Sequence, residues 1–582
     1  MAKKFAEHKG LDLVSTNQEV LKEWEKKDIF HKSIDEREGD PQFIFFEGPP
    51  SANGHPGIHH VLARAIKDTF NRYKTMQGFQ VHRKAGWDTH GLPVELGVEK
   101  ELGITKKDID NHASDKYIST EEYNHKCREN VMKFTAEWKQ LTEEMGYFVD
   151  MEHPYITYDN KYIETLWWLL KQLYNKGLLY KGYTIQPYSP GAGTGLSSHE
   201  LNQPGCYRDV KDTTATAQFA IPTEDWKALA EKANLPKETW GKPCFVAWTT
   251  TPWTLPSNVA LCVGPKIEYV IVETYNPYDA EKLTLVMAAS RVAAYLKSEG
   301  EITDGGELPA YDRGDKYVPY RIVGRVMGTE LEGLHYQQLM PWVKPVEQTG
   351  DFAPKFVNDY AAAHPEKVFA SEDGRDKFVE MESEAFRIIL GDYVTTDDGT
   401  GIVHIAPTFG ADDAKVAKDA NIPALYLISK KGQTRPMVDL QGKYYTIDEL
   451  DQNFVKACVN VGAYGHHAGD YVKGSYDPRF NPDGVWDKKA SENAEDLNIV
   501  LCMEKKQDGT AFNIQKHVHN YPHCWRTDKP ILYYPLDSWF IKDTARKERM
   551  VELNKTIHWQ PESTGTGRFG NWLENLNDWN LS

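Results

Sequence analysis

The sequence is poor in cysteine. Its 582 residues include seven cysteines, which lie far apart and never form a Cys-X-X-Cys pair. An odd and scattered set of this kind argues against a disulfide-stabilised secreted domain. It indicates reduced thiols, as in cytoplasmic proteins.

Long apolar runs are also missing. No segment approaches the roughly 20 uncharged apolar residues that a membrane-spanning helix needs. The N-terminal residues MAKKFAEHKGLDLVS contain no apolar stretch between a basic start and a small-residue cleavage site, so they do not have the pattern of a secretory signal. We therefore expect a cytoplasmic protein without a membrane partner.

Basic residues are outnumbered by acidic ones. The sequence contains 68 lysines and arginines but 85 aspartates and glutamates, which gives a net charge of -17. This balance argues against indiscriminate binding to nucleic acid, although a basic cleft on an acidic body is compatible with it. Hydrophobic residues make up 40% of the chain, enough to fill real cores, and the length suggests about three or four domains.

The first third of the chain has the pattern of a βαβ unit. A helical lead-in over residues 11–36 precedes an apolar run at 43–46, which is typical of a buried parallel strand. A loop of turn-forming residues at 48–54 follows, then helical spacing over 57–77 and an extended segment over 79–87. In such units ligands bind beyond the carboxyl ends of the strands, and anions bind at the helix N-terminus.

Polar side chains gather at both of these places. His55, His59 and His60 stand where the helix begins, so they could donate to phosphate oxygens, although a histidine cluster on the surface would look the same. Asp88 and His90 follow the second strand, where the carboxylate could pair with a substrate ammonium group.

The two segments together, GPPSANG and GWDTHGLPVELGVEKELGI, resemble the active-site half of the class I aminoacyl-tRNA synthetases. Within this family the match is to the isoleucyl/valyl/leucyl subgroup, and the residues of the two segments are most similar to those of its isoleucyl members. The resemblance implies that ATP, with Mg²⁺, activates isoleucine to its adenylate, which then reacts with tRNA(Ile). It also implies a monomer. By this resemblance the residues that bind substrate and adenylate are Gly48, Pro49, Pro50, Asp88 and His90.

The sequence departs from the family in its loop-to-helix signature, His-X-Gly-His. The aligned residues are Gly57-Ile58-His59-His60, so the first histidine and the glycine are exchanged. With Asn53, these four are the expected catalytic residues. The exchange either impairs activation or is a compensated variant that still works, and we favour compensation because the surrounding residues are intact.

The same exchange generates a prediction about inhibitors. Because a side chain now occupies a place that usually admits close approach of the nucleotide, we expect altered sensitivity to compounds that fill this pocket, such as mupirocin. Inhibition of ATP–pyrophosphate exchange at ordinary drug concentrations would contradict this expectation.

Between about residues 190 and 520 the pattern changes to short β-type runs separated by Gly, Pro and Asp, as in a mostly β barrel or sandwich. The expected strands are 213–220, 245–250, 269–273, 283–288, 316–323, 393–396 and 401–406. A β module set inside an α/β domain is similar to the CP1 insertion of this family, the editing domain that hydrolyses mischarged tRNA. Such a second sieve is needed because one methylene supplies only about 1–3 kcal/mol of discrimination.

Two motifs in the insertion support this interpretation. WTTTPWTLPSN resembles the threonine-rich editing strand, and GTGIVHIAP followed by Asp412-Asp413 resembles the opposite wall. The resemblance implies that Asp413 holds the ammonium group of the substrate, and that His404 and the threonine hydroxyls contact the terminal ribose and position water. Alternatively, the threonines only favour a strand and His404 is a core histidine. The expected editing residues are Thr249, Thr250, Thr251, Asn258, His404 and Asp413.

Related enzymes often carry Cys-X-X-Cys pairs beside this insertion, which suit tetrahedral zinc. Here residues 187–192 contain no cysteine, and Cys524 has no nearby partner in sequence. We therefore predict no structural zinc and no metal-binding residues.

The expected organisation is an α/β fold in which a Rossmann-type catalytic domain is interrupted by the β-rich insertion. Its parts are a helical lead-in over 1–40, the first half of the catalytic domain over 41–190, the CP1 insertion over 191–520 and a return to the catalytic domain over 521–582. The last residues, GRFGNWLENLNDWNLS, stay apolar and periodic to the end, and no lysine-rich KMSKS-type loop follows. We expect the catalytic domain to be incomplete at its C-terminus and the chain to be a fragment without full activity.

The alternatives are a valyl enzyme, a stand-alone deacylase that uses only the β domain, and a non-catalytic tRNA-binding remnant.

Overall fold

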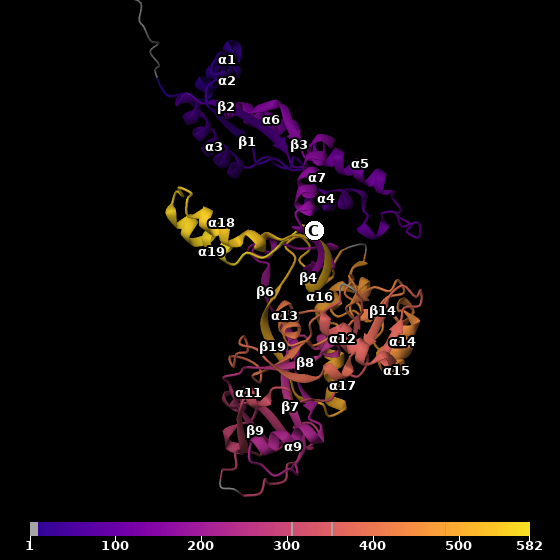
Figure 1. Cartoon of the computed structure of the whole chain (residues 1–582). Coiled ribbons are helices and arrows are strands. Elements are labelled where there is room, and N and C mark those ends of the chain that lie inside the picture. The colour runs from indigo at the N-terminus through magenta and orange to yellow at the C-terminus, as the bar shows by residue number, and fades with distance from the viewer. Residues whose placement is uncertain (1–9, 304–305, 351–352, 483–484, 582) are drawn as a thin grey trace, which may run out of the picture. The chain divides into compact units, whose positions relative to one another are not determined.

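The structure is a computed structural model that describes residues 10–303, 306–350, 353–482 and 485–581. Residues 1–9 of the expected lead-in lie outside the described part. The chain divides into two compact units (Figure 1). Unit 1 comprises Met1–Tyr180 and Phe540–Trp579, and unit 2 comprises Lys181–Trp539 and Asn580–Ser582.

Unit 1 contains a three-stranded parallel sheet in the order β1-β2-β3. Its strands are β1 (Gln42–Phe46), β2 (Gln80–Trp87) and β3 (Asp150–Ile156). The chain crosses from β1 to β2 through α3 (Ile58–Met76), and from β2 to β3 through α4 (Leu92–Leu102), α5 (Thr120–Val131) and α6 (Thr135–Glu144). The expected strand–loop–helix–strand pattern is confirmed.

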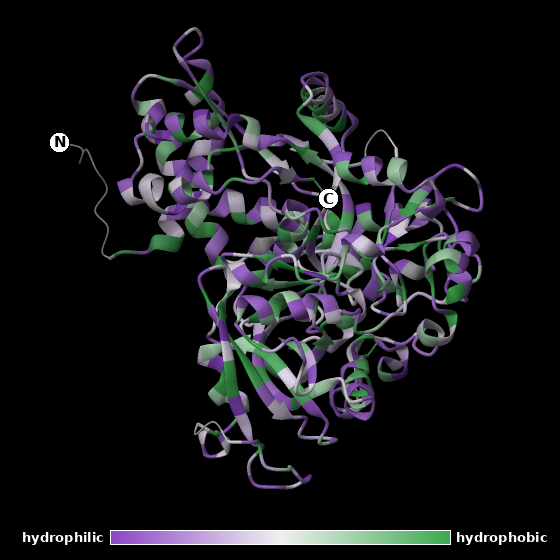
Figure 2. Cartoon of the chain, turned by 60° about the horizontal axis from the view of Figure 1, so that its bottom comes forward, coloured by the Kyte–Doolittle hydropathy of each residue, from purple (hydrophilic) through white to green (hydrophobic). Residues whose placement is uncertain are grey.

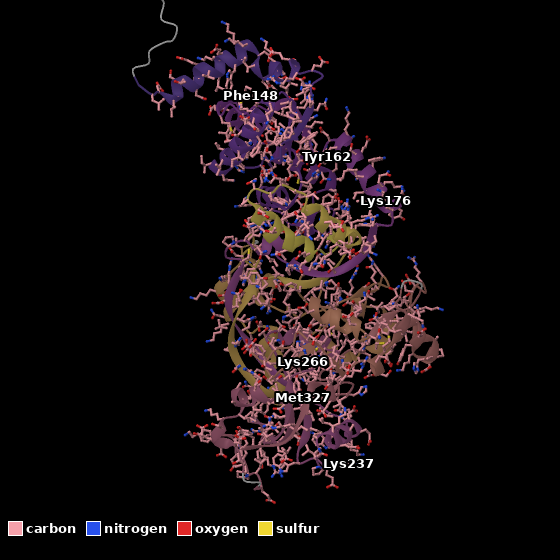
Figure 3. All side chains as sticks on the ribbon, turned by 60° about the vertical axis from the view of Figure 1, so that its left-hand side comes forward. Phe148, Tyr162, Lys176, Lys237, Lys266 and Met327 are labelled. Atoms are coloured by element: carbon pink, nitrogen blue, oxygen red, sulfur yellow. The ribbon has the colours of Figure 1, made fainter. Side chains whose placement is uncertain are left out.

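The lead-in forms two helices rather than one, α1 (Leu13–Lys27) and α2 (Ile29–Asp35). The chain breaks between them because Asp28 adopts a left-handed conformation with φ of 52°. Phe148, labelled in Figure 3, anchors both helices, since its ring lies 4.9 Å from Trp24 and 5.6 Å from Phe30. The remaining helices of unit 1 are α7 (Asn160–Asn175), α18 (Lys547–Asn554) and α19 (Phe569–Glu574).

The expectation that the first strand is buried is wrong for one of its faces. Ile44 and Phe46 are each 59% exposed. A row of apolar side chains on α3 is exposed as well: Ile58, Leu62, Ile66, Phe70, Tyr73 and Met76. The sequence shows that these residues are apolar but not what covers them. α3 lies over the face of the sheet that carries Phe45 and Arg83, so Ile44 and Phe46 on the other face stay exposed.

Unit 2 is built on a six-stranded sheet in the order β11-β9-β10-β7-β6-β19. Neighbouring strands are antiparallel except for the parallel pair β10 and β7. The strands are β6 (Tyr207–Ala220), β7 (Lys242–Thr249), β9 (Glu268–Tyr275), β10 (Lys282–Ala288), β11 (Tyr320–Met327) and β19 (Ala511–Pro522). The longest pairing, β6 with β19, joins residues about 300 positions apart in the sequence.

Smaller sheets and short helices complete unit 2. One sheet has the order β15-β8-β16 and another the order β12-β14-β13. Their strands are β8 (Ala260–Val263), β12 (Val346–Gln348), β13 (Val368–Ala370), β14 (Lys377–Glu380), β15 (Arg387–Leu390) and β16 (Ile402–Ile405). The helices are α8 (Ser198–Leu201), α9 (Thr223–Lys232), α10 (Val292–Tyr295), α11 (Gly328–Leu331), α12 (Lys355–Ala363), α13 (Ala411–Asp419), α14 (Gln452–Cys458), α15 (Val461–Gly465), α16 (Lys488–Asn493) and α17 (Leu497–Gln507).

A large core joins the sheets of unit 2, and a second apolar cluster lies on the other face of the six-stranded sheet around Val246, Val272 and Leu285. Fully buried aromatic residues from different elements lie in the large core, including Phe219, Tyr269, Phe378 and Tyr444. Figure 2 shows the corresponding mixture of hydrophobic and hydrophilic residues along the strands and helices. None of the described helices is long and apolar enough to cross a membrane.

Most strands expected in the insertion are present, but one is wrong. Residues 393–396 form no strand. Their Val-Thr-Thr composition favours extended structure, yet no neighbouring segment pairs with them, and they run directly into a turn that ends at Gly399 with φ of 65°. The strand expected at 316–323 begins only at Tyr320 and continues to Met327.

A buried ionic cluster lies beside the β6–β19 pair. Asp212 of β6 accepts from His519 Nε2 of β19 at 3.0 Å and from Lys473 Nζ at 3.3 Å. Burial opposes ionisation of Asp212, but the hydrogen bond from His519 and the charge of Lys473 outweigh it and lower its pKa to about 2.

A further sheet has the order β21-β20-β4-β5, with β4 (Leu179–Ser189), β5 (Thr194–Gly195), β20 (Leu532–Ile541) and β21 (Trp579–Asn580). The chain passes from unit 1 to unit 2 within β4 and returns within β20. The limits of unit 2 therefore fall inside strands rather than in loops.

Close packing of β2 against β3 generates a prediction. A Cβ on Gly86 would lie 2.3 Å from the ring of Tyr155, and the Tyr155 hydroxyl is itself fixed by the carbonyl of Glu47. We expect Gly86→Ala to destabilise unit 1 by about 1–3 kcal/mol through overpacking. Urea unfolding followed by hydrogen exchange of the β2 and β3 amides measures this. Gly97→Ala in α4 is the matched control, because its Cβ would have ordinary contacts, and it should leave stability unchanged or raise it.

Candidate functional site

In unit 1 the loop over residues 48–54 lies at the carboxyl end of β1 and is fixed by its neighbours. The Pro50 carbonyl accepts from the Asp88 N–H at 3.1 Å, and the Gly54 carbonyl accepts from Trp138 Nε1 at 2.9 Å. Ala52 is fully buried between them. Pro49, Pro50 and Asn53 are half-buried and Gly48 is exposed, so the loop offers its polar backbone on a rigid support.

The histidines expected at the helix start divide into two groups. His59 and His60 lie together, with ring centroids 3.8 Å apart, and the His60 ring packs at 4.7 Å from Trp138. His60 Nδ1 accepts from the N–H of Gly57 at 2.9 Å, so this imidazole caps the first turn of α3. His55 instead pairs with Glu137 at 2.7 Å.

The environment of His60 favours its neutral form. Burial, the neighbouring His59 and the charge of Arg64 lower its pKa below the ordinary value. His59 and Ile58 are exposed, and Ile58 points most of its side chain to solvent. The exchanged tetrad thus forms a regular helix start in which the last histidine is held by the first glycine.

Asp88 and His90 lie where β2 ends. Asp88 is half-buried, and the described residues give it no ion pair; its carboxylate accepts only a long bond of 3.4 Å from the His90 N–H. His90 Nδ1 lies 3.1 Å from the hydroxyl of Thr157, which also accepts from the Thr89 N–H. Asp88 is therefore a negative charge beside the loop without a cation of its own.

A second charged group beside the loop was missed by the sequence reasoning. Glu47, only 3% exposed, accepts from the ammonium group of Lys67 and from the hydroxyl of Tyr147. Lys67 Nζ also lies 3.7 Å from the position of a Cβ on Gly48. Lys67 comes from the middle of α3, and only its helical spacing from the loop could have indicated this approach.

In unit 2 the threonine run lies at the end of β7, a central strand of the sheet, rather than on an edge strand. The Thr249 hydroxyl accepts from the N–H of Thr251 at 3.0 Å, and the two hydroxyls are 3.4 Å apart. Thr251 Oγ1 is 3.3 Å from Thr254 Oγ1, which is 3.3 Å from His404 Nε2. A chain of hydroxyls thus connects β7 to β16. Thr250 is half-buried beside it.

His404 is a buried histidine with one ring nitrogen unused. Its Nε2 faces Thr254, whereas Nδ1 has no hydrogen-bond partner among the described residues. Burial lowers its pKa to about 4, so the ring is neutral at physiological pH. It can exchange hydrogen bonds with a hydroxyl or a water but cannot supply a positive charge.

Asn258 and Asp413, the other two expected editing residues, differ in how accessible they are to solvent. Asn258 is 2% exposed and engaged by Tyr336, whose hydroxyl donates to its Oδ1 at 2.6 Å, while its own amide donates to the Ala260 carbonyl. Tyr336 lies 78 residues away in the sequence, so no local signal could have revealed it. Asp413, at the start of α13, is half-buried and accepts from the Ala406 N–H at 2.9 Å.

Asp413 is withdrawn from water, and no ion pair to it occurs among the described residues. Burial and the neighbouring Asp412 outweigh the Ala406 hydrogen bond and raise its pKa to about 6. A cavity of about 600 Å³ opens on the other side of α13, where Asp412, Lys415 and Arg387 line it. Asp413, His404 and the threonines do not line this cavity, so the chemistry of the motif residues is separate from it.

A family model described as tRNA synthetases class I (I, L, M and V) matches residues 19–582. The chain belongs to this family. Membership accounts for the parallel βαβ unit with a loop at the end of β1 and for the β-rich insertion within an α/β chain.

Curated relatives in this synthetase family are similar over the whole chain. The isoleucine–tRNA ligase of Bacteroides thetaiotaomicron is 61% identical over 582 residues, which cover all of this chain and 46% of the relative. The isoleucine–tRNA ligase of Porphyromonas gingivalis is 56% identical, with the same coverage of both chains. That of Clostridium acetobutylicum is 37% identical over 98% of this chain and 42% of its own length. The chain therefore spans about half the length of these relatives.

The raised pKa of Asp413 generates a prediction. The folded protein binds the proton of the Asp413 carboxyl more tightly than the unfolded chain does. Protonation of Asp413 therefore stabilises the fold fully below about pH 4, and this contribution is lost as the pH rises towards 6. Asn at position 413 does not ionise, so Asp413→Asn avoids this loss of stability, and the amide oxygen can still accept from the Ala406 N–H. We expect this variant to be more stable than the wild type by about 1–3 kcal/mol at pH 7.5, and the gain to shrink at pH 5.

Chemical unfolding at the two pH values measures the difference. The control is Asp419→Asn, which removes a charge from the exposed end of the same helix and should show a small effect that is the same at both pH values. An equal gain at pH 5 and pH 7.5 for Asp413→Asn would contradict the assignment.

Proposed function

We propose that the chain is the N-terminal part of an isoleucine–tRNA ligase, in which unit 1 activates the amino acid and unit 2 edits the product. The observation that carries this proposal is the 61% identity, over every residue of the chain, to an isoleucine–tRNA ligase. The expected cofactor is ATP with Mg²⁺, and the expected partners are isoleucine and tRNA(Ile). We further propose a cytoplasmic monomer and reduced sensitivity to mupirocin.

In unit 1 the proposed roles follow from charge and position. The loop at 48–54 and the first turn of α3 offer backbone N–H groups and the positive end of the helix dipole to the phosphates of ATP. Asp88, half-buried without a cation, fits the ammonium group of isoleucine. His59 is exposed at the helix start, where its ring can reach a phosphate oxygen, whereas His60 Nδ1 is already used in holding Gly57.

In unit 2 the proposed reaction is hydrolysis of the ester that joins valine to tRNA(Ile). The hydroxyl chain of Thr249, Thr251 and Thr254 and the neutral His404 can exchange hydrogen bonds with the terminal ribose and with the attacking water. Asp413 supplies the negative charge for the substrate ammonium group, and that cation would bring its raised pKa down again. These residues would then bind the substrate by one ion pair and several neutral hydrogen bonds.

Deacylation of valyl-tRNA(Ile) by the 582-residue chain tests this proposal. We expect Asp413→Ala to lower the rate roughly 10- to 100-fold, because a hydrogen bond to a charged group contributes about 1.5–3 kcal/mol. Asp419→Ala, at the exposed end of the same helix, should change the rate less than twofold.

Two further substrates separate the alternatives. Hydrolysis of threonyl-tRNA(Val) in preference to valyl-tRNA(Ile) would favour the valyl enzyme. No deacylation of either, together with binding of tRNA, would favour a non-catalytic remnant and overturn the proposal for unit 2. Exchange of ATP with pyrophosphate in the presence of isoleucine distinguishes a synthetase from a stand-alone deacylase.

A further inference from the structure

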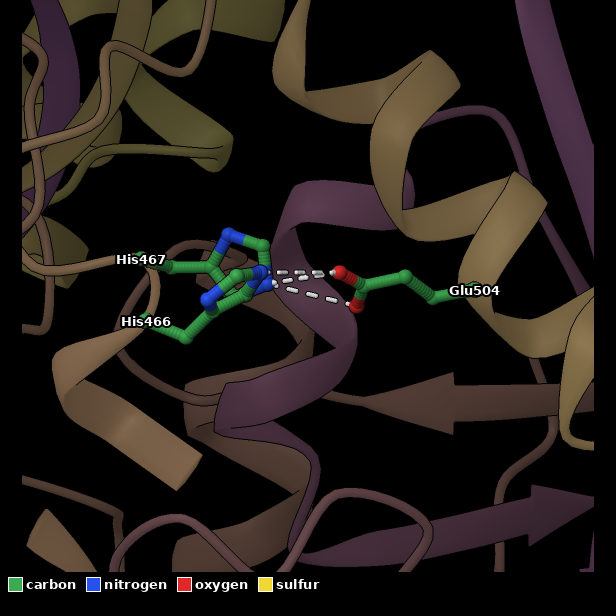
Figure 4. A group of neighbouring side chains, drawn as sticks. All are labelled: His466, His467 and Glu504. Atoms are coloured by element: carbon green, nitrogen blue, oxygen red, sulfur yellow. Dashed lines mark hydrogen bonds and ion pairs between the residues drawn. The ribbon is translucent and has the colours of Figure 1, made fainter. Parts of the chain in front are cut away.

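A turn in unit 2, remote in sequence from the motif residues, holds a cluster of metal-ligating side chains. His466 and His467 follow α15, and Glu504 lies on α17 (Figure 4). His467 Nε2 is 3.2 Å from the Glu504 carboxylate, and His466 Nε2 is 3.7 Å from Oε1 of the same carboxylate. One ligand atom from each residue lies within 4.8 Å of the other two.

The backbone of the turn is fixed. The Asp470 N–H donates to the His467 carbonyl at 3.0 Å, and the Asp470 carbonyl accepts from the Tyr444 N–H at 2.9 Å. The His467 side chain is only 3% exposed, and its ring stacks on Trp342 with centroids 5.0 Å apart. The ring therefore has a set orientation towards Glu504.

His467 is held between two acceptors. Its Nδ1 lies 3.2 Å from Asp470 Oδ2, and its Nε2 faces Glu504. A neutral imidazole carries one N–H, so it can donate to only one of them. With the proton on Nδ1, the lone pair of Nε2 would face a carboxylate, which is repulsive unless a second proton or a metal ion lies between them.

The arrangement has the features of a metal site. Histidines that bind metal usually donate their other ring N–H to a carboxylate, as His467 can to Asp470. Tetrahedral zinc with bonds of about 2.0–2.1 Å needs ligand atoms roughly 3.3 Å apart. The two distances from the histidine nitrogens to Glu504, 3.2 and 3.7 Å, are close to this value, and all three ligand atoms lie within 4.8 Å. His466 is 74% exposed, which provides both an entry path for the ion and freedom for the ring to adjust.

We propose that His466, His467 and Glu504 bind one divalent transition-metal ion, with zinc as the preferred metal and a water in the fourth position. The ion would fasten the turn after α15 to α17, joining residues 37 positions apart. The donor set is two imidazoles and a carboxylate. The proposal therefore departs from the sequence-based expectation of no structural zinc and no metal-binding residues, which considered cysteine ligands only.

Zinc titration of the purified chain, first stripped with a chelator, tests the proposal. We expect one zinc ion per chain and a higher melting temperature when zinc is added. His466→Ala and Glu504→Gln should each weaken binding at least tenfold and abolish the thermal shift, and Asp470→Asn should weaken it roughly 10- to 100-fold. His364→Ala is the matched control, because His364 is also an exposed histidine beside a glutamate, and it should bind zinc like the wild type.

Cobalt substitution identifies the donor atoms. The Co²⁺ form should show visible absorption bands of a tetrahedral site without a thiolate charge-transfer band, and His466→Ala should remove them. Binding with unchanged affinity in His466→Ala, or a thiolate band, would place zinc elsewhere and overturn the proposal. Absence of stoichiometric zinc would also overturn it and leave His467 as a doubly protonated ion-pair partner. Because His466 is exposed, loss of fold is not expected in that variant, and its circular dichroism checks this.

Discussion

The pairing of β6 with β19 is the contact on which unit 2 depends. It brings together two segments about 300 residues apart, and the chain between them supplies the other four strands of the six-stranded sheet. Closing so long a loop costs conformational entropy, which the backbone ladder and the buried cluster of Asp212, Lys473 and His519 must offset. The Asp212 carboxylate, held by Lys473 and His519, also disfavours a shifted register, because a shift would separate its charge from these partners.

Both candidate sites use the same electrostatic arrangement. Each has a carboxylate for which the described residues give no ion pair, Asp88 in unit 1 and Asp413 in unit 2, and each also contains a histidine whose pKa is lowered by burial, His60 and His404 respectively. An acid of this kind gains most from a substrate that brings its own ammonium group, and a neutral imidazole does not compete for it. Under the proposed function, both units would bind the ammonium group of an amino acid, although their folds differ.

Local sequence patterns predicted the helices and strands better than they predicted the contacts that these elements make. The βαβ unit and most strands of the insertion were predictable, because helical and alternating periodicity are encoded in neighbouring residues. The strand predicted at 393–396 is absent because strand propensity does not specify a pairing partner. The burial expected for Ile44 and Phe46 is absent because apolar character does not specify which residues cover a side chain. The motif residues could be named from resemblance, but Tyr336 behind Asn258 and Glu47 with Lys67 come from distant segments and were invisible before folding.

The exposed apolar side chains of β1 and α3 have a consequence for the colloidal behaviour of the protein. A stripe of them runs along α3 from Ile58 to Met76, and Ile44 and Phe46 of β1 are exposed as well. Exposed apolar surface and a strand edge that no described residue pairs favour self-association, whereas a net charge of -17 keeps molecules apart through long-range repulsion. Since salt screens the repulsion but strengthens rather than weakens apolar contact, ionic strength sets the balance between dispersed chains and aggregates.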